Sequence, residues 1–224
     1  MNVKGFKVNF LGDSITEGVG VSDQNNRYDN ALARMLGLSQ VNSYSISGSR
    51  LAHQIFPSAK PRYDLCFCGR AYDMDKSADM VIVYGGVNDY IHGDAPFGAI
   101  GDTNPSTFCG GVYFLMSFLR ETYGDKPILF LAPARCFLRK EIDDRFPSTH
   151  AAKRVAGKEL RAYADAILET AKEFDVKVLD LYNDLGIDPH DPKQFEAYTT
   201  DGLHFNDAGH AVLANKVKEF IEAL

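Results

Sequence analysis

The sequence lacks long apolar runs, an excess of basic residues and a framework of cysteines. No apolar stretch approaches the roughly 20 residues that a membrane-spanning helix needs. The formal net charge is -6, and lysine and arginine form no long run, which disfavours a partner with a phosphate backbone. We therefore expect neither a membrane span nor a nucleic-acid partner.

The four cysteines are too few, in a chain of 224 residues, for the disulfide framework of a small secreted scaffold. Cys66 and Cys68 are separated by one residue, whereas structural zinc sites usually place about two to four residues between their thiols, and no second pair follows. Buried or free thiols are the better interpretation. The sequence implies no metal and no cofactor.

The amino terminus does not resemble a secretory signal. Lys4 and Lys7 are present, but the apolar residues beyond them alternate with polar ones and lead directly into a turn rich in glycine and serine. This favours a cytoplasmic protein, with a removed signal peptide as the open alternative. With 45% hydrophobic residues, the chain can bury a substantial core, and we expect one domain over residues 1–224.

Apolar residues recur with two different periods along the chain. Alternating or continuous apolar runs predict strands over residues 6–11, 41–46, 80–84, 127–132 and 176–181. Helical spacing predicts helices over residues 28–36, about 108–119 and about 151–174, and after Asn206. Residues 91–105 and 183–200 are predicted as connections, and residues 135–145 as a solvated excursion. Strands that alternate with helices indicate a three-layer α/β/α domain with a parallel sheet.

Ser14 stands where the first predicted strand stops. Gly12 and Gly18 allow the backbone to turn sharply around it, so the serine hydroxyl is well placed at a sheet edge and is a candidate nucleophile. The local pattern alone favours a simpler interpretation, because most serines at strand ends form turns or cap helices. A catalytic role therefore requires partners elsewhere in the chain.

Suitable partners follow the other predicted strands. Gly48 and Asn88 come just after the second and third strands, and ligands of open parallel sheets bind beyond the carboxyl ends of the strands. Asp201 and His204 follow the fifth strand, and one turn can bring the carboxylate to a ring nitrogen while the other nitrogen faces outward. Aspartate would then orient the histidine, and the histidine would take the serine proton.

Four blocks of the sequence resemble, in order, those of the SGNH hydrolases, also called the GDSL-like lipase/acylhydrolase superfamily: Gly12-Asp13-Ser14, Gly48, Gly86-Val87-Asn88-Asp89 and Asp201-Gly202-Leu203-His204. The resemblance implies a flavodoxin-like fold with strand order 2-1-3-4-5. It also implies Ser14 as nucleophile, His204 as general base and Asp201 as its partner. The backbone N–H groups of Ser14 and Gly48 and the side chain of Asn88 would form the oxyanion hole.

The expected activity is hydrolysis of carboxylic esters through an acyl-serine, with short acyl groups such as acetyl on a carbohydrate favoured. The loops after the strands hold few long aliphatic residues, and His53 and His92 follow the Gly48 and Asn88 turns closely enough to line the pocket. A lysophospholipase or acyl-thioesterase would use the same residues. The alternative of another class is a noncatalytic protein that binds a carbohydrate or a partner on the same fold. The expected partner is a small-molecule or carbohydrate ester, and the sequence does not indicate an oligomeric state.

Overall fold

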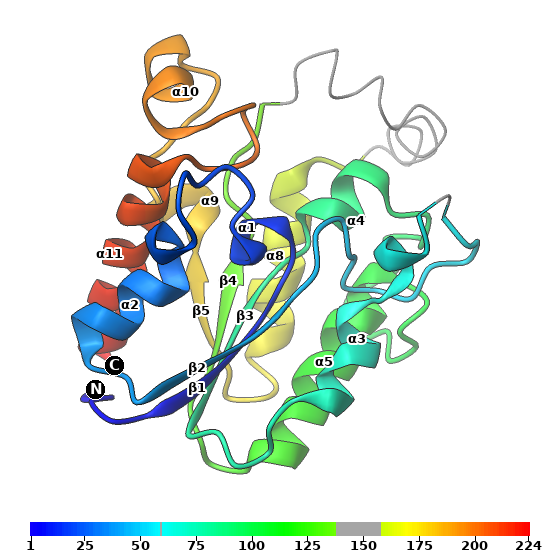
Figure 1. Ribbon diagram of the computed structural model, residues 1–224. Helices are drawn as coiled ribbons and strands as arrows, with labels where there is room; N and C mark the ends of the chain where they lie inside the picture. The colour runs from blue at the N-terminus through cyan, green and yellow to red at the C-terminus, as the bar shows by residue number, and fades with distance from the viewer. Residues whose placement is uncertain (59, 138–157) are drawn as a thin grey trace.

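Five parallel strands form the centre of the molecule. The structure is a computed structural model that describes residues 1–58, 60–137 and 158–224. The strands stand in the order β2-β1-β3-β4-β5 (Figure 1). Their bounds are Lys7–Gly12 for β1, Gln40–Ser45 for β2, Met80–Tyr84 for β3, Ile128–Ala132 for β4 and Lys177–Asp180 for β5. This confirms the predicted sheet and its order, and each strand ends within one residue of its predicted limits.

Helices cover both faces of the sheet and give the expected three layers (Figure 1). One face is covered by α2 (Tyr28–Leu36) and α11 (Asp207–Ala223). The other is covered by α3 (Phe67–Arg70), α5 (Phe108–Tyr123) and α8 (Leu160–Ala171). Shorter helical segments lie between these elements: α1 (Ser14–Glu17), η1 (Gln24–Asn26), η2 (Pro61–Asp64), η3 (Ala71–Asp73), α4 (Val87–His92), α9 (Leu181–Asp184) and α10 (Pro192–Tyr198).

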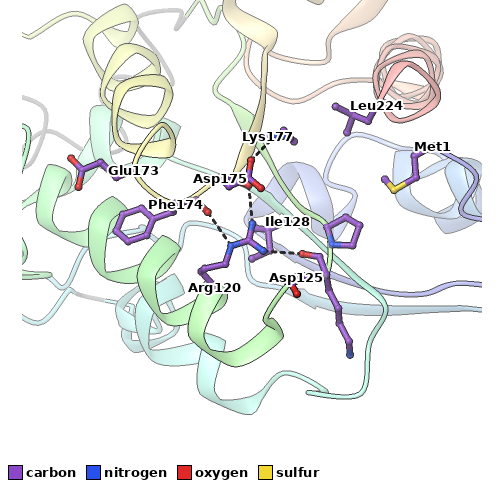
Figure 2. A pocket seen from close by; sticks show the side chains of 11 residues that line it. Met1, Arg120, Asp125, Ile128, Glu173, Phe174, Asp175, Lys177 and Leu224 are labelled. Carbon is purple, nitrogen blue, oxygen red and sulfur yellow. Dashed lines mark hydrogen bonds and ion pairs between the residues drawn. The ribbon is translucent and has the colours of Figure 1, made fainter.

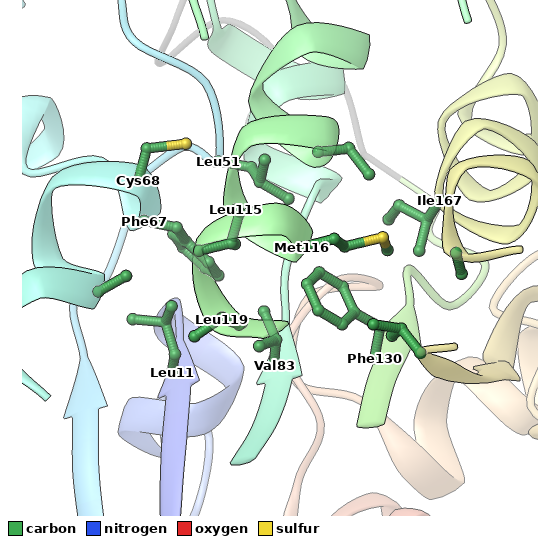
Figure 3. Packing of buried hydrophobic residues seen from close by; sticks show 14 of the residues in the cluster. Leu11, Leu51, Phe67, Cys68, Val83, Leu115, Met116, Leu119, Phe130 and Ile167 are labelled. Carbon is green, nitrogen blue, oxygen red and sulfur yellow. The ribbon is translucent and has the colours of Figure 1, made fainter. Parts of the chain in front are cut away.

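Neighbouring side chains along each strand enter different cores, because successive residues of a strand point to opposite faces of the sheet. Phe10 packs with the α2 and α11 face, whereas Leu11 packs with the opposite one. Figure 3 shows this second core, in which Leu11, Val83 and Phe130 of the sheet lie beneath Leu115 of α5. Both faces of the central strands are therefore apolar, which accounts for the continuous hydrophobic runs in the sequence.

Two helix ends follow the expected chemistry. Gly37 ends α2 with a left-handed backbone, φ 66°, and its N–H bonds the carbonyl of Ala33. The side chain of Asn206 accepts a hydrogen bond from the Gly209 N–H and so caps α11.

Other boundaries differ from the predicted ones. Residues 183–200 are not wholly a connection, because α10 begins at Pro192 with Asp191 as its cap. The loop predicted from Ile91 starts later, since α4 continues to His92. In its described part, the helix predicted over about 151–174 is α8, Leu160–Ala171; residues 151–157 lie outside the described residues, as does most of the predicted excursion over 135–145.

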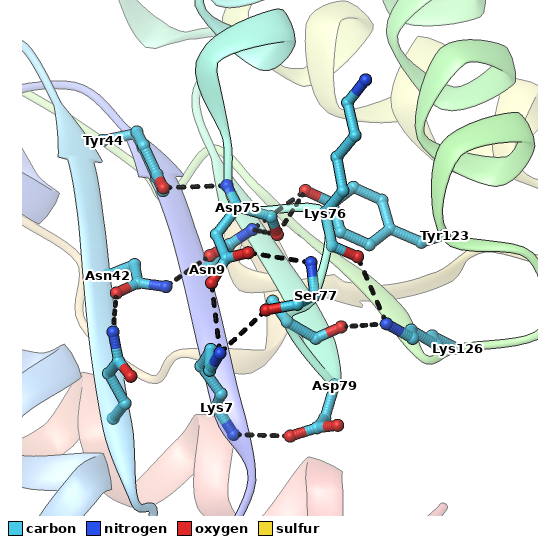
Figure 4. A network of polar contacts seen from close by, with 12 residues as sticks. Lys7, Asn9, Asn42, Tyr44, Asp75, Lys76, Ser77, Asp79, Tyr123 and Lys126 are labelled. Carbon is cyan, nitrogen blue, oxygen red and sulfur yellow. Dashed lines mark hydrogen bonds and ion pairs between the residues drawn. The ribbon is translucent and has the colours of Figure 1, made fainter.

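The amino ends of the strands are held by polar contacts. Asn9, fully buried in β1, donates to the Asp75 carbonyl at 2.8 Å and to the Tyr123 hydroxyl at 2.9 Å, and it accepts from Asn42 at 3.0 Å (Figure 4). Every polar atom of this buried amide therefore has a partner, as the low dielectric of the interior requires.

A pocket of about 470 Å³ lies at this same end of the sheet, near the starts of β4 and β5 (Figure 2). Its arginine, Arg120, donates to the carbonyl oxygens of Phe174, Asp175, Gly124 and Lys126. The guanidinium is thus occupied in joining α5 to the turn before β5, which is a structural role.

All four cysteines are free thiols, as the sequence analysis expects, and Cys66, Cys68 and Cys109 are buried. Burial raises the pKa of the Cys109 thiol to about 11. Among residues 1–58, 60–137 and 158–224, no helix is both long and apolar enough to cross a membrane.

Candidate active site

Ser14 is the first residue of α1. This short helix directly follows the carboxyl end of β1 (Figure 1). Asp13 precedes it and caps this short helix, since its Oδ1 accepts a hydrogen bond from the Ile15 N–H at 3.0 Å. Gly12 is required just before, because a Cβ there would lie 2.1 Å from Oγ1 of Thr16. The tight turn leaves Ser14 largely buried, with 5% of its surface exposed.

Asp201 and His204 stand in one loop before α11. His204 Nδ1 lies 2.7 Å from Asp201 Oδ2, and its Nε2 lies 3.0 Å from Ser14 Oγ. Asp201 Oδ1 also accepts the backbone N–H groups of Leu203 and His204, at 3.0 and 2.8 Å. The structure therefore brings the three residues proposed for catalysis into one chain of hydrogen bonds, across 190 positions of sequence.

The shape of this loop depends on Gly202. Its φ is 84°, and a Cβ would lie 2.1 Å from the carbonyl oxygen of Phe137. The Gly202 carbonyl in turn accepts from the Phe137 N–H at 2.9 Å, and an antiparallel bridge between Thr199 and Phe205 closes the base of the loop. The aspartate and histidine are thus fixed by backbone contacts on both sides.

The carboxyl group of Asp201 is held in its ionised form. Burial acts to raise its pKa, but the hydrogen bond and charge of His204 and the two backbone N–H groups outweigh burial and lower the pKa to about 2. An ionised Asp201 can only accept a hydrogen bond, so His204 carries a hydrogen on Nδ1. Without a second proton, its Nε2 is then free to accept the hydroxyl hydrogen of Ser14.

Gly48 follows β2 with a φ of 74°, in the left-handed region. The ring of Tyr63 lies directly against it, and a Cβ on Gly48 would come within 2.4 Å of Tyr63 Cε1. Because Gly48 has no side chain, the ring of Tyr63 can pack directly against its backbone. The backbone N–H groups of Ser14 and Gly48 donate to no other residue in the described part of the chain.

Asn88 lies in the first turn of α4, after β3. Its Nδ2 is 3.1 Å from the Ser49 carbonyl oxygen and 3.3 Å from Asp13 Oδ2. The next residue, Asp89, accepts the N–H groups of Leu51 and Ala52 at 2.8 and 3.0 Å. Asp89 therefore holds the loop that follows Gly48.

These residues share a pocket of about 210 Å³, which is lined by Ser14, Val19, Ser47, Gly48, Tyr63, Asn88, Ile91, His92, Leu203 and His204. His92 lines it as the sequence predicts. His53 does not: it lines a separate pocket with Gln54 to Pro57, Asp64 and Cys66, and its N–H bonds the Pro105 carbonyl. The chain leads His53 away from the site because the loop after Ala52 runs outward, where His53 and residues 55–57 are exposed.

The sequence analysis missed Arg70, which holds the strand ends together. This buried guanidinium donates from Nη2 to the Gly12 carbonyl at 3.1 Å and to Ser49 Oγ at 2.8 Å, and from Nη1 to the Tyr44 carbonyl. Burial lowers its pKa to about 10, so it stays charged at neutral pH. No local pattern around Arg70 signals these contacts, which join segments distant in sequence.

Glu17 is a second residue that the sequence analysis missed, although its spacing from Ser14 could have indicated its position. It lies one turn after Ser14, and its Oε2 accepts the N–H and the hydroxyl of Ser47, next to Gly48. Arg62 donates to its other oxygen. The three-residue helical spacing from Ser14 places Glu17 beside the Gly48 loop.

Asp13 carries the most strongly altered carboxyl group beside Ser14. Complete burial raises its pKa to about 6, although the Ile15 N–H and the charges of His204 and Arg70 act in the opposite direction. A protonatable carboxyl group therefore lies between the serine and the amide of Asn88.

The chain is similar to known proteins over almost its whole length. A sequence model of the GDSL-like Lipase/Acylhydrolase family matches residues 10–212. Among solved structures, the chain is similar to a protein from Lactobacillus plantarum, with 31% identity and a TM-score of 0.83 over 99% of this chain and 98% of that one. A search of curated proteins found no match.

Two further solved structures share the fold at lower identity. A carbohydrate acetylesterase family member from Sinorhizobium meliloti is 19% identical, with a TM-score of 0.66 over 97% of this chain and 98% of that one. An acetyl xylan esterase is 21% identical, with a TM-score of 0.61 over 96% of this chain and 99% of that one.

Proposed function

The chain belongs to the GDSL-like lipase/acylhydrolase family, and from this premise we propose that it is a serine esterase that removes short acyl groups, acetyl above all, from carbohydrates. The observation that carries the proposal is the chain of hydrogen bonds from Asp201 through His204 to Ser14, at 2.7 and 3.0 Å. An orienting acid, a base and a nucleophile that are hydrogen-bonded in this order support acyl transfer to serine.

In the first step, Ser14 Oγ forms a bond to the carbonyl carbon of the ester, and its proton passes to His204 Nε2. The carbonyl oxygen becomes an oxyanion. When the intermediate collapses, the bond to the leaving alcohol oxygen breaks, and that oxygen takes the proton from His204. Asp201 stabilises the transient imidazolium through the bond to Nδ1.

The oxyanion would accept hydrogen bonds from the N–H groups of Ser14 and Gly48 and from the Nδ2 of Asn88, all of which belong to residues lining one pocket. One N–H of the Asn88 amide bonds the Ser49 carbonyl at 3.1 Å. The other makes the longer contact to Asp13, at 3.3 Å, and an oxyanion would take its place.

The second half-reaction releases the acid. Water attacks the carbonyl carbon of acyl-Ser14 while His204 Nε2 takes its proton, and the same donors stabilise the second oxyanion. The bond from carbon to Ser14 Oγ then breaks, and Oγ regains its proton from His204. The products are a carboxylic acid and the free serine.

The size of the pocket supports a short acyl group. Its volume is about 210 Å³, below the range of roughly 300–1,000 Å³ that is common for drug-sized ligands. The two structural neighbours described as a carbohydrate acetylesterase family member and an acetyl xylan esterase favour a carbohydrate as the alcohol.

The nucleophile is tested with Ser14→Ala and, as a matched control, Ser106→Ala, which removes an exposed hydroxyl. We expect Ser14→Ala to lose p-nitrophenyl acetate hydrolysis and labelling by a fluorophosphonate, while Ser106→Ala retains both. Unchanged hydrolysis by Ser14→Ala would show that the assignment is wrong.

The substrate class is tested by acid release from acetylated xylan and acetylated monosaccharides, compared with lysophospholipids and acyl-CoA. We expect kcat/KM for the acetylated sugars to be at least about tenfold higher, because each 1.4 kcal/mol of better transition-state binding gives about tenfold. A preference for lysophospholipid or acyl-CoA would contradict the substrate. A protein that neither reacts with the fluorophosphonate nor hydrolyses any of these esters would favour the alternative of a noncatalytic binding protein.

A further inference from the structure

A buried row of polar side chains lies behind the proposed oxyanion hole. It begins at Arg50, passes through His92 and ends at Asn88, and each residue is at most 4% exposed. Arg50 Nη1 lies 3.2 Å from His92 Nδ1, and His92 Nε2 lies 3.0 Å from Asn88 Oδ1. None of the catalytic steps described above uses the first two residues.

The contacts of Asn88 determine which atom of its amide faces His92. The Ser49 carbonyl oxygen and Asp13 Oδ2 are both acceptors, and both lie next to the same amide atom, at 3.1 and 3.3 Å. That atom must be the nitrogen, so the amide oxygen faces His92. An oxygen can only accept, and His92 Nε2 must therefore carry the hydrogen.

The contacts of Arg50 lead to the same tautomer from the other side of the ring. A guanidinium donates at every nitrogen, so His92 Nδ1 must accept from it. Asp64 Oδ1 holds the guanidinium in place through a bond to Nη2 at 2.8 Å. The contacts of His92 with Asn88 and with Arg50 thus independently require a hydrogen on His92 Nε2 and none on His92 Nδ1.

We propose that His92 is a positioning residue for the oxyanion hole: held by Arg50, it donates to Asn88 and keeps the amide nitrogen turned toward the pocket. The proposal rests on the proposed esterase function. An amide turned by half a rotation would place its oxygen against the Ser49 carbonyl, Asp13 and the developing oxyanion, all of which repel it. The bond from His92 is lost in that rotated state, because two donors would meet.

The kinetic test compares His92→Leu with His92→Gln. Leucine fills space but cannot donate, whereas the amide nitrogen of glutamine can reach the place of Nε2. Removal of an oxyanion donor commonly costs about 100-fold to 1,000-fold in kcat. Because misorientation removes part of that effect, we expect His92→Leu to lower kcat by about 10-fold to 100-fold with KM changed less than about twofold, and His92→Gln to stay within about threefold of the wild type.

A double variant separates positioning from a simple pocket wall. In an Asn88→Ala background, no amide remains to be oriented, so we expect His92→Leu to lower kcat by less than about threefold. An equal loss in both backgrounds, or a His92→Leu protein with the kcat of the wild type, would overturn the proposal.

The tautomer of His92 can be measured in the wild-type protein without turnover. In wild-type protein labelled with ¹⁵N-histidine, long-range ¹H–¹⁵N spectra distinguish hydrogen on Nε2 from hydrogen on Nδ1, and the signals missing from His92→Gln identify His92. We expect the Nε2 form, and the Nδ1 form would overturn the proposal. A wild-type protein that neither hydrolyses esters nor reacts with a fluorophosphonate would instead refute the proposed function, and the role of His92 in it.

Discussion

The ionisation of Asp13 should make the protein less stable as the pH rises. In the unfolded chain this carboxyl has a pKa near 3.8, and in the folded chain burial raises the pKa to about 6. Between these two values, the folded protein binds more protons than the unfolded one. The free energy of unfolding contributed by Asp13 is therefore fully present below about pH 4, falls as the pH rises, and levels off above about pH 6.

The size of this effect follows from the two pKa values. Their difference, about 6 minus 3.8, corresponds to about 3 kcal/mol at 1.36 kcal/mol per pKa unit. About 2 kcal/mol of this change falls between about pH 4.5 and pH 7.5. Asp13→Asn has no group that ionises at this position. The difference in unfolding free energy between wild type and variant should therefore change by about 2 kcal/mol over this pH range. The wild type becomes less stable relative to the variant as the pH rises.

Urea unfolding of both proteins, followed by circular dichroism across this pH range, measures the difference. The amide that Asp13→Asn introduces changes the contact with Asn88, but this adds a constant that leaves the trend unaffected. Asp125→Asn removes an exposed carboxyl and serves as the control. A wild-type minus Asp13→Asn difference that stays within about 0.5 kcal/mol at all pH values, or that grows with pH, would refute the reasoning.

Three further substitutions separate chemistry from stability. Asp201→Asn should lower kcat by about 10⁴, because an amide in place of the carboxylate favours the wrong tautomer of His204, and a loss below tenfold in p-nitrophenyl acetate hydrolysis would contradict this. Gly48→Ala should lower kcat by about 100-fold, since the new Cβ would lie 2.4 Å from Tyr63 Cε1 and must displace the loop. Circular dichroism should show that the variant still folds. An unchanged kcat would argue against Gly48 in the oxyanion hole. Asn9→Ala should leave kcat unchanged but lower the urea-derived free energy of unfolding by about 2–3 kcal/mol, because three hydrogen bonds of a buried amide are lost. A smaller loss would show that the polar network matters little.

The sheet could be predicted from the sequence because the hydrophobic pattern is strong where both faces of a strand are buried. The run over Met80–Tyr84 is apolar at every position, and the structure buries all of it. Helix α10 escaped prediction because it is short and buries only Phe195, so no apolar period develops. Its start signals, Asp191 as cap and Pro192 at the first position, were present but were outweighed by the prolines of a turn-like segment.

The site was predictable to the extent that it consists of strand ends and one turn. Ser14, Asp201 and His204 could be placed together because parallel strands bring their carboxyl ends to one edge. His53 and His92 could not be separated by this argument, since both follow such ends closely. Tertiary contacts decide between them: His92 continues α4 into the pocket, whereas the loop that carries His53 runs outward.

The buried Arg70 shows why the short motifs alone are an incomplete description of this edge. Buried carbonyl groups at the ends of β1 and β2 need donors. From a segment with no recognisable motif, Arg70 donates to the Tyr44 carbonyl and gives the Gly12 carbonyl a second donor besides the Ile46 N–H. Its planar guanidinium also donates to the Leu65 carbonyl and to Ser49, which the single nitrogen of a lysine could not do at once. Because this cation fixes the ends of β1 and β2, the turn that presents Ser14 and the loop that contains Gly48 are held relative to each other. The geometry of the proposed oxyanion hole therefore depends on a residue that supplies none of its donors, and the loss of that residue should disturb the spacing of Ser14 and Gly48 before it unfolds the sheet.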